Sequence, residues 1–141
     1  MRILAIDYGT KRIGLAVSDP LGMISQGLET LPHPSSPEAL IGKIGEVVKR
    51  HHVSKIVLGL PLNMNGTRGP QALQAEALAE TLRRGLSLPV ELWDERLSTA
   101  SVQRHFRQWH LSPVKQRKLV DRLSAQLILQ DYLDAQKGKT S

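Results

Sequence analysis

The segment that most constrains the fold is a short apolar run at residues 3–6, which ends at Asp7. Such a run predicts a buried strand, and residues 8–11 predict a turn directly after it. Residues 12–18 predict a second strand, close enough in sequence to form a hairpin with the first. The chain is therefore expected to begin with a β-hairpin that carries a carboxylate where its first strand ends.

Helix and strand patterns alternate after this hairpin. We expect a third strand at 23–31, whose pattern is weaker, then a helix with Ser36 as cap and Pro37 as first residue, and a strand at 55–60. These are followed by a helix at 70–84 that Gly85 ends, a strand at 90–93, a helix capped by Ser98, and a last helix at 119–135. The basic stretch 110–118 is left without an assigned order. This succession predicts an α/β fold, a mixed sheet with helices on both faces, in which the later strands run parallel to the first.

Length and composition narrow the class of protein. A chain of 141 residues fits one domain, which we assign to residues 1–136, with a disordered tail at 137–141. Because the chain has no cysteine, disulfides and thiolate metal sites are excluded, which agrees with a cytoplasmic protein. No apolar stretch approaches the roughly 20 residues that span a membrane. The sequence does not indicate an oligomeric state.

The charge balance is basic, with a formal net charge of +6, and it favours a polyanionic partner such as nucleic acid. With only two Trp, two Tyr and one Phe, base stacking is a less suitable binding mode than contacts of Lys and Arg with the phosphate backbone. The candidates for such contacts are Lys11, Arg12, Arg68 and Arg96, which lie beside the expected carboxyl edge of the sheet. For any one of them alone, solvated surface charge is the better explanation.

Acidic residues stand where separate elements begin or end. Asp7 and Glu95 follow expected strands, and ligands of α/β sheets gather at the carboxyl ends of strands. Asp121 lies at the start of the last helix, where an acid also complements the helix dipole. Asp94 fits a helix cap. If Asp7, Glu95 and Asp121 converge, their oxygens would suit Mg²⁺ or Mn²⁺, and such ions can activate a water for phosphodiester hydrolysis. No HExxH or His-x-His spacing competes as a metal motif.

The loop at residues 59–69 is rich in small and amide residues. Its backbone N–H groups could approach a phosphate at the start of the helix that follows. Asn-Gly loops are also common turns, so this signal has little specificity by itself.

Four segments together resemble one known family. They are IDYGTKRIGLA at 6–16, GLPLNMNG at 59–66, DERLST at 94–99 and DRLSAQLILQDYL at 121–133. In this order and spacing they are similar to the YqgF family, whose members are described as pre-16S rRNA nucleases and as Holliday junction resolvases. The resemblance spans nearly the whole chain.

The resemblance implies an RNase H-like fold with a five-stranded mixed sheet. It also implies a metal-dependent nuclease in which Asp7, Glu95 and Asp121 are the catalytic and metal-binding acids, with Mg²⁺ or Mn²⁺ as cofactor. The chain departs from the family pattern at Asn65, where aspartate is frequent, and at Ser124, where alanine is commoner. The implied substrate is the 5′ end of pre-16S rRNA, in ribosome maturation, or branched DNA.

Two functions of other classes stay open. The segment from Asp7 to Thr10, followed by a glycine-bearing strand, resembles the first phosphate loop of actin-like and sugar kinases, although those enzymes enclose ATP between two such domains. A non-catalytic RNA-binding protein that assists ribosome assembly would explain the basic charge without the acids.

Overall fold

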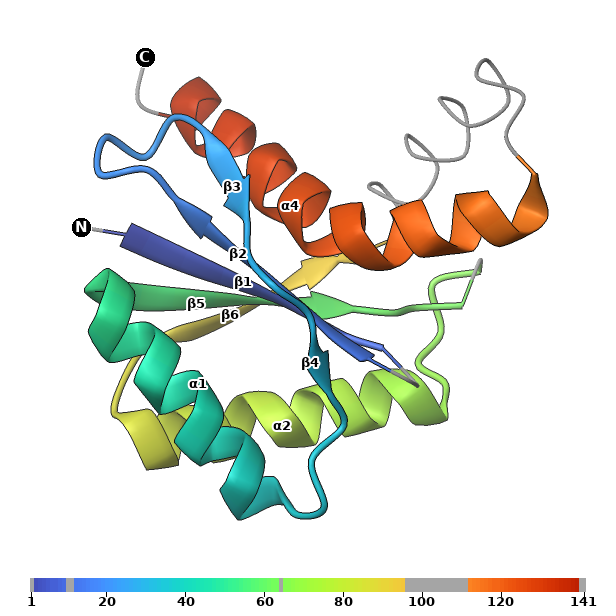
Figure 1. The fold of residues 1–141 in the computed structure, drawn as a ribbon, viewed down its shortest axis with the longest axis horizontal. Coiled ribbons are helices and arrows are strands. Elements are labelled where there is room, and N and C mark those ends of the chain that lie inside the picture. The colour runs from blue at the N-terminus through green and yellow to red at the C-terminus, as the bar shows by residue number, and fades with distance from the viewer. Residues whose placement is uncertain (1, 10–11, 64, 96–111, 140–141) are drawn as a thin grey trace.

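The computed structural model describes residues 2–9, 12–63, 65–95 and 112–139 (Figure 1). Its elements in chain order are β1 (Arg2–Tyr8), β2 (Arg12–Ser18), β3 (Ser25–Gly27), β4 (Leu31–Pro32), α1 (Pro37–His51), β5 (Val53–Leu60), α2 (Pro70–Leu86), β6 (Val90–Asp94) and α4 (Pro113–Lys139). The helix expected after Ser98 lies outside the described residues.

The strands form one mixed sheet in the order β3-β2-β1-β5-β6. β1 pairs antiparallel with β2, whereas β5 is parallel to β1 and β6 is parallel to β5. This confirms the predicted hairpin and the predicted parallel direction of the later strands. The sheet has six strands rather than five, because the third expected strand is split into β3 and β4, which both pair with β2. Pro32 has no N–H group to donate, which helps to limit β4 to two residues.

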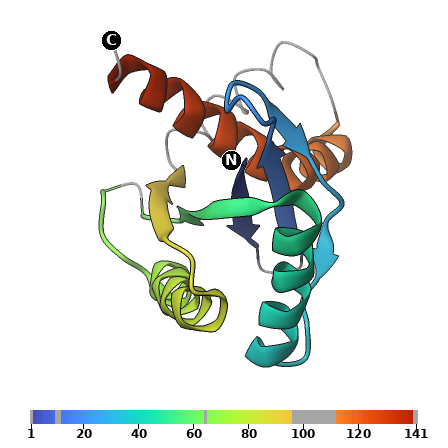
Figure 2. The ribbon, with the colours of Figure 1, turned by 90° about the vertical axis from the view of Figure 1, so that its left-hand side faces the viewer.

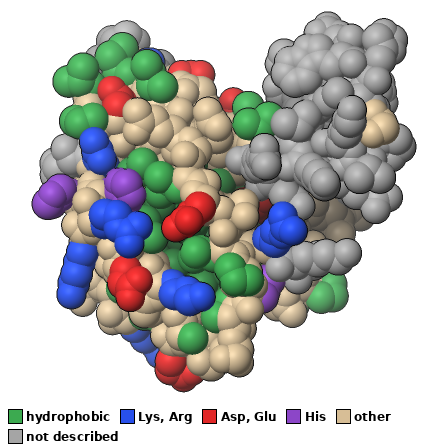
Figure 3. Space-filling view, in the orientation of Figure 1, with side chains coloured by type: hydrophobic (Ala, Val, Ile, Leu, Met, Phe, Trp, Pro, Cys, Tyr) green, Lys and Arg blue, Asp and Glu red, His purple; other side chains and the backbone are tan. Residues whose placement is uncertain are grey.

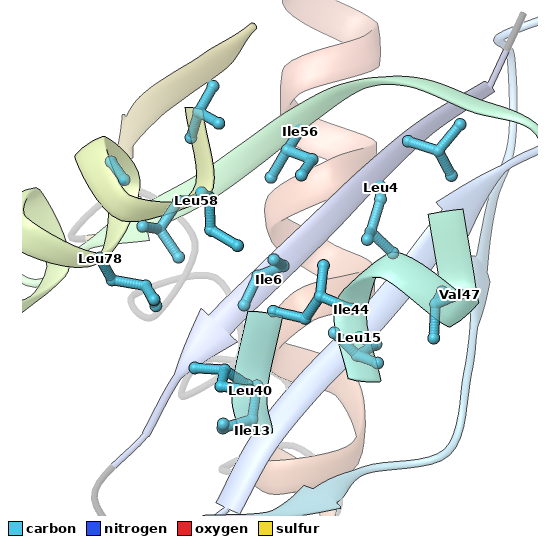
Figure 4. Packing of buried hydrophobic residues seen from close by; sticks show 14 of the residues in the cluster. Leu4, Ile6, Ile13, Leu15, Leu40, Ile44, Val47, Ile56, Leu58 and Leu78 are labelled. Carbon is cyan, nitrogen blue, oxygen red and sulfur yellow. The ribbon is translucent and has the colours of Figure 1, made fainter. Parts of the chain in front are cut away.

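Helices cover both faces of the sheet, as predicted. Figure 2 shows the sheet between α4 on one side and α1 with α2 on the other. Side chains alternate along β1, so that Leu4 and Ile6 face α1 and α2 while Ala5 faces α4. Figure 4 shows the first of these two cores. Its labelled members are Leu4, Ile6, Ile13, Leu15, Leu40, Ile44, Val47, Ile56, Leu58 and Leu78.

The core beneath α4 is built from small strand residues and large helix residues. The sheet contributes Ala5, Ala16 and Val57. From α4 come Ala125, Ile128, Leu129, Tyr132 and Leu133. Because the strand side chains are short, the long helix packs directly against β1, β2 and β3. This packing fixes α4 beside the carboxyl end of β1.

The helix ends agree with the predicted caps in one case and differ in another. Ser36 caps α1, since its Oγ accepts a hydrogen bond of 3.2 Å from the N–H of Ala39. The prediction that Gly85 ends α2 was wrong, because the helix continues to Leu86 and closes at Ser87, with φ of 54°. Gly85 instead serves helix packing: a Cβ there would lie 2.9 Å from Cγ2 of Ile41 on α1.

The last helix is longer than expected. α4 begins at Pro113 rather than at residue 119, and thus includes residues 113–118 of the stretch whose order the sequence left open. It runs to Lys139, while the division into a domain at 1–136 and a tail at 137–141 stays a prediction. Among the described residues, no helix has the length and apolar character needed to cross a membrane.

The loop between β2 and β3 presents apolar side chains to solvent. Leu21, Met23 and Ile24 are 82%, 48% and 60% exposed, and hydrophobic side chains gather at this corner of the molecule, at the upper left of Figure 3. Asp19 holds the turn, since its Oδ1 accepts hydrogen bonds from the N–H groups of Met23 and Ile24 at 2.7 and 2.9 Å. These bonds to Ile24 and Met23 lower the pKa of Asp19.

Candidate active site

Asp7 lies near the end of β1, between two strands that have glycine at the same level. In β2 its partner is Gly14. In β5 the register pairs Ile6 with Leu58, so the next residue, Gly59, comes level with Asp7. Since neither glycine has a side chain, the sheet surface is open on both sides of the Asp7 carboxylate. Alternation along β1 puts this carboxylate on the α4 face, two residues after Ala5.

Glu95 uses the space above Gly59. It follows the edge strand β6, in which Trp93 pairs with Gly59. A Cβ on Gly59 would lie 2.8 Å from both Cγ and Cδ of Glu95, closer than real side chains approach. The Glu95 side chain therefore reaches across β5 toward Asp7, and the two carboxyl groups are hydrogen-bonded to each other.

This arrangement shifts the ionisation of Glu95. Its pKa is raised from 4.5 to about 9, in the first place by burial, then by the hydrogen bond with Asp7 and by the negative charges of Asp7 and Asp94. Glu95 therefore keeps its proton at neutral pH in the metal-free protein. A proton held between two carboxylates occupies a place that a cation can take instead.

The carboxylate pair fits the divalent cation that the sequence implies. Mg²⁺ and Mn²⁺ bind carboxylate oxygens, and Asp7 and Glu95 supply such oxygens from adjacent parts of the sheet. Within the described residues, no group of three His, Cys, Asp or Glu side chains gathers as a metal centre. The third expected acid, Asp121, is a residue of α4, but its side chain is outside the described part of the chain.

The four expected basic residues have different surroundings. Arg12 is exposed at the first position of β2, two residues before Gly14. Arg68 makes a salt bridge of 3.0 Å with Glu76 on α2, so its guanidinium already has a carboxylate partner. Lys11 and Arg96 lie outside the described residues. Of the two that the structure describes, both are exposed, and Arg12 is the one at the start of β2, beside the end of β1.

No motif in the sequence indicates a role for His33, which the structure places beside the hairpin. Its Nε2 is hydrogen-bonded to the carbonyl oxygen of Gly9, and its ring contacts that of Tyr8 edge to face at 5.0 Å between centroids. These contacts join His33 to residues far from it in the sequence, and the loop that contains His33 has no motif.

Side chains stabilise the loop that follows β5. Asn65 Oδ1 accepts hydrogen bonds from both the N–H and the hydroxyl of Thr67, at 3.1 and 2.6 Å. Asn63 Nδ2 donates to the same hydroxyl at 3.0 Å. These bonds give Asn65 a structural role. The contact of this loop with a phosphate stays a prediction.

The fold is RNase H-like. The structure entitled "T. thermophilus RuvC in complex with Holliday junction substrate" matches with a TM-score of 0.58 at 15% identity, covering 98% of this chain and 96% of that chain. A second RuvC structure from Thermus thermophilus matches with a TM-score of 0.55 at 16% identity, covering 98% of this chain and 97% of that one. At such identities the likeness establishes the fold alone.

Sequence comparison supplies the family. The profile described as "RuvX: Holliday junction resolvase" matches residues 1–135, and the chain belongs to this family. A protein of Pelotomaculum thermopropionicum named "Putative pre-16S rRNA nuclease" is 46% identical over 136 residues, covering 96% of this chain and 88% of the relative. A Streptococcus sanguinis protein of the same name is 45% identical over 136 residues, covering 95% and 98%. The resemblance seen in the sequence and the class of enzyme, a hydrolase of phosphodiester bonds, are thus confirmed.

Proposed function

We propose that this protein is a cytoplasmic, metal-dependent nuclease that cuts near the 5′ end of pre-16S rRNA during ribosome maturation. The observation that carries the proposal is the hydrogen-bonded pair of Asp7 and Glu95 over Gly59. Two carboxyl groups held together in this way repel each other once ionised, and a divalent cation relieves that repulsion. The names of the relatives support rRNA as the substrate.

The acidic and the basic residues of the site have different proposed roles. Asp7 and Glu95 hold the cation, with Asp121 as the third acid expected from α4. Held by these acids, Mg²⁺ or Mn²⁺ would supply a water of lowered pKa and positive charge at the leaving oxygen of the phosphodiester. Arg12, exposed two residues from Gly14, attracts the phosphate backbone toward the carboxylates. Lys11 and Arg96 belong to the same proposed set, and Arg68 does so only if it leaves Glu76.

A DNA substrate is the second candidate. The matching family profile carries the description of a Holliday junction resolvase, which favours branched DNA. Both substrates present the same phosphodiester to the carboxylates, so that the pair of Asp7 and Glu95 is compatible with either. The choice between them depends on surfaces further from the site.

A cleavage assay tests the proposal and separates the two substrates. Precursor 16S rRNA and a four-way DNA junction are incubated side by side with Mg²⁺ or Mn²⁺ and with wild-type protein, Asp7→Asn or Asp134→Asn. Asp134 is an exposed aspartate of α4, far from the carboxylate pair in sequence, and serves as the matched control. We expect metal-dependent cleavage of the rRNA that Asp7→Asn abolishes and Asp134→Asn retains.

Other results would favour another function. Cleavage of the junction alone would assign the DNA substrate. Salt-dependent RNA binding that survives Asp7→Asn, without product in either metal, would assign a non-catalytic binding protein. Binding of ATP in calorimetry would revive the phosphotransferase interpretation.

A further inference from the structure

A cavity of about 350 Å³ lies on the opposite side of the sheet from the Asp7 carboxylate. It is bounded by the segment that enters α1 and by one side of α2, and Leu40 and Leu78 contribute its apolar wall. Tyr8 of β1 lines it as well. The volume is near the lower end of the range of about 300–1,000 Å³ that is typical of ligand pockets. It is therefore large enough for one small organic group.

The polar groups in this cavity are neutral and several are unused. Among the described residues that line it, none is charged, although the chain carries a net charge of +6. The side chains of Tyr8, Ser35 and Gln74 line the cavity, and none of them has a hydrogen-bond partner among the described residues. A primary amide and two hydroxyl groups can donate and accept at once. An apolar wall combined with such groups is the chemistry that recognises a nucleobase rather than a phosphate.

Only the peptide unit between Asp7 and Tyr8 separates the cavity from the carboxylate pair. Asp7 and Tyr8 are consecutive in β1, so their side chains point to opposite faces of the sheet. The Tyr8 ring is held in place by the edge-to-face contact with His33. A single strand that crosses the carboxyl end of β1 can thus set a phosphate beside Asp7 and turn a neighbouring base toward Tyr8.

We propose that this cavity is a nucleobase pocket, which binds one unpaired base close to the phosphate that is cut at Asp7 and Glu95. The inference rests on the proposed nuclease function and adds a contact to the base, where that function needs only the backbone. Because an aromatic contact with a base contributes about 1–3 kcal/mol, the pocket would strengthen binding of single-stranded nucleic acid by about 5- to 150-fold.

Photocrosslinking tests the pocket without requiring cleavage. Single-stranded RNA oligonucleotides that carry 4-thiouridine at successive positions are bound to the protein in metal-free buffer, irradiated and mapped by mass spectrometry. Ala77→Phe fills the pocket from an exposed position of α2, whereas Leu73→Phe places the same ring on that helix outside the pocket. Gln74→Ala removes the amide without filling the space, and so reports on the pocket even if the larger side chain disturbs the helix.

We expect a crosslink from one oligonucleotide position to the segment 34–37, Tyr8 or Gln74, lost in Ala77→Phe, weakened in Gln74→Ala and retained in Leu73→Phe. Crosslinks that are the same in all three variants would overturn the proposal. The two functions can fail separately. If the RNA crosslinks to the pocket but is not cut in the presence of either metal, the pocket is supported and the nuclease function is contradicted. If Ala77→Phe cleaves the RNA at the wild-type rate and binds it with the wild-type affinity, the nuclease function is supported and the pocket is contradicted.

Discussion

Glu95 lies over Gly59 so closely that any side chain at position 59 would displace it, since a Cβ there would be 2.8 Å from Cδ of Glu95. The glycine is thus part of the carboxylate site, although it has no chemistry of its own. It provides the space through which Glu95 at the edge of the sheet meets Asp7 in the middle of it.

The first prediction follows from this contact. Gly59→Ala should weaken Mg²⁺ binding and cleavage by about a hundredfold or more, because misplacing a catalytic group by an ångström costs about that much. The fold should persist, since alanine is compatible with a strand. Calorimetric titration with Mg²⁺ and the cleavage assay measure the two effects.

Gly42→Ala is the matched control for this variant. A Cβ at Gly42, in α1, meets nothing within 4 Å, so the exchange should leave metal binding unchanged. It should also stabilise the helix by up to about 1 kcal/mol. Equal metal affinity in Gly59→Ala and Gly42→Ala would show that Glu95 does not depend on the space above Gly59.

The second prediction concerns pH. In the folded, metal-free protein the pKa of Glu95 is about 9, whereas its ordinary value is 4.5. Between these two pH values the folded state therefore keeps a proton that the unfolded state has released. The free energy of unfolding should therefore be highest below the lower pKa and fall by up to about 1.4 kcal/mol per pH unit until the higher one is passed. Urea titrations in EDTA between pH of about 5 and 8 measure this slope.

Two comparisons isolate the group responsible. Glu95→Gln should flatten the slope, whereas Glu29→Gln, at an exposed position, should preserve it. Excess Mg²⁺ should also reduce the slope in the wild type, since metal binding replaces the proton. A slope that survives Glu95→Gln would place the titrating group elsewhere.

Particular residues show which parts of the fold and of the site could be predicted from the sequence. The apolar run before Asp7 and the glycine-bearing strand after it predict the hairpin, because both depend on neighbours in the chain. Parallel strands then bring Asp7 and Glu95 to one edge, as the topology predicts. The part played by Gly59 could not be read from the sequence, since it depends on the register between three strands. His33 was missed for the same reason: its contact with Gly9 spans 24 positions.

The third prediction tests the contact between α1 and α2. Gly85→Ala gains up to about 1 kcal/mol in helix propensity, but overpacking costs about 1–3 kcal/mol. The overpacking should win, because Cγ2 of Ile41 would lie 2.9 Å from the new Cβ and a β-branched side chain cannot easily rotate away. We expect net destabilisation of about 1 kcal/mol in urea unfolding. The double variant Gly85→Ala with Ile41→Ala should lose less stability than the two single effects added together.

The fourth prediction concerns the polar contact that joins α4 to β5. Lys55 Nζ donates a hydrogen bond to the hydroxyl of Tyr132 and makes a salt bridge of 2.9 Å with Glu91. Burial lowers the pKa of Lys55, but the hydrogen bonds with Tyr132 and Glu91 outweigh it and raise the pKa above its ordinary value. The ammonium group therefore stays charged, with its side chain 33% exposed. The Tyr132 ring also contacts Trp93 edge to face at 5.4 Å between centroids.

Tyr132→Phe should cost about 1 kcal/mol in urea unfolding, because the ring contact stays and the lysine keeps Glu91 and water as partners. Tyr132→Ala should cost about 3–5 kcal/mol, since it removes a buried ring. The two variants should also differ in cleavage. Tyr132→Phe should remain active because α4 keeps its place, whereas Tyr132→Ala should lose activity along with the packing that positions the helix of Asp121. Equal losses in both variants would mean that the hydroxyl, and not the ring, holds α4 against the sheet.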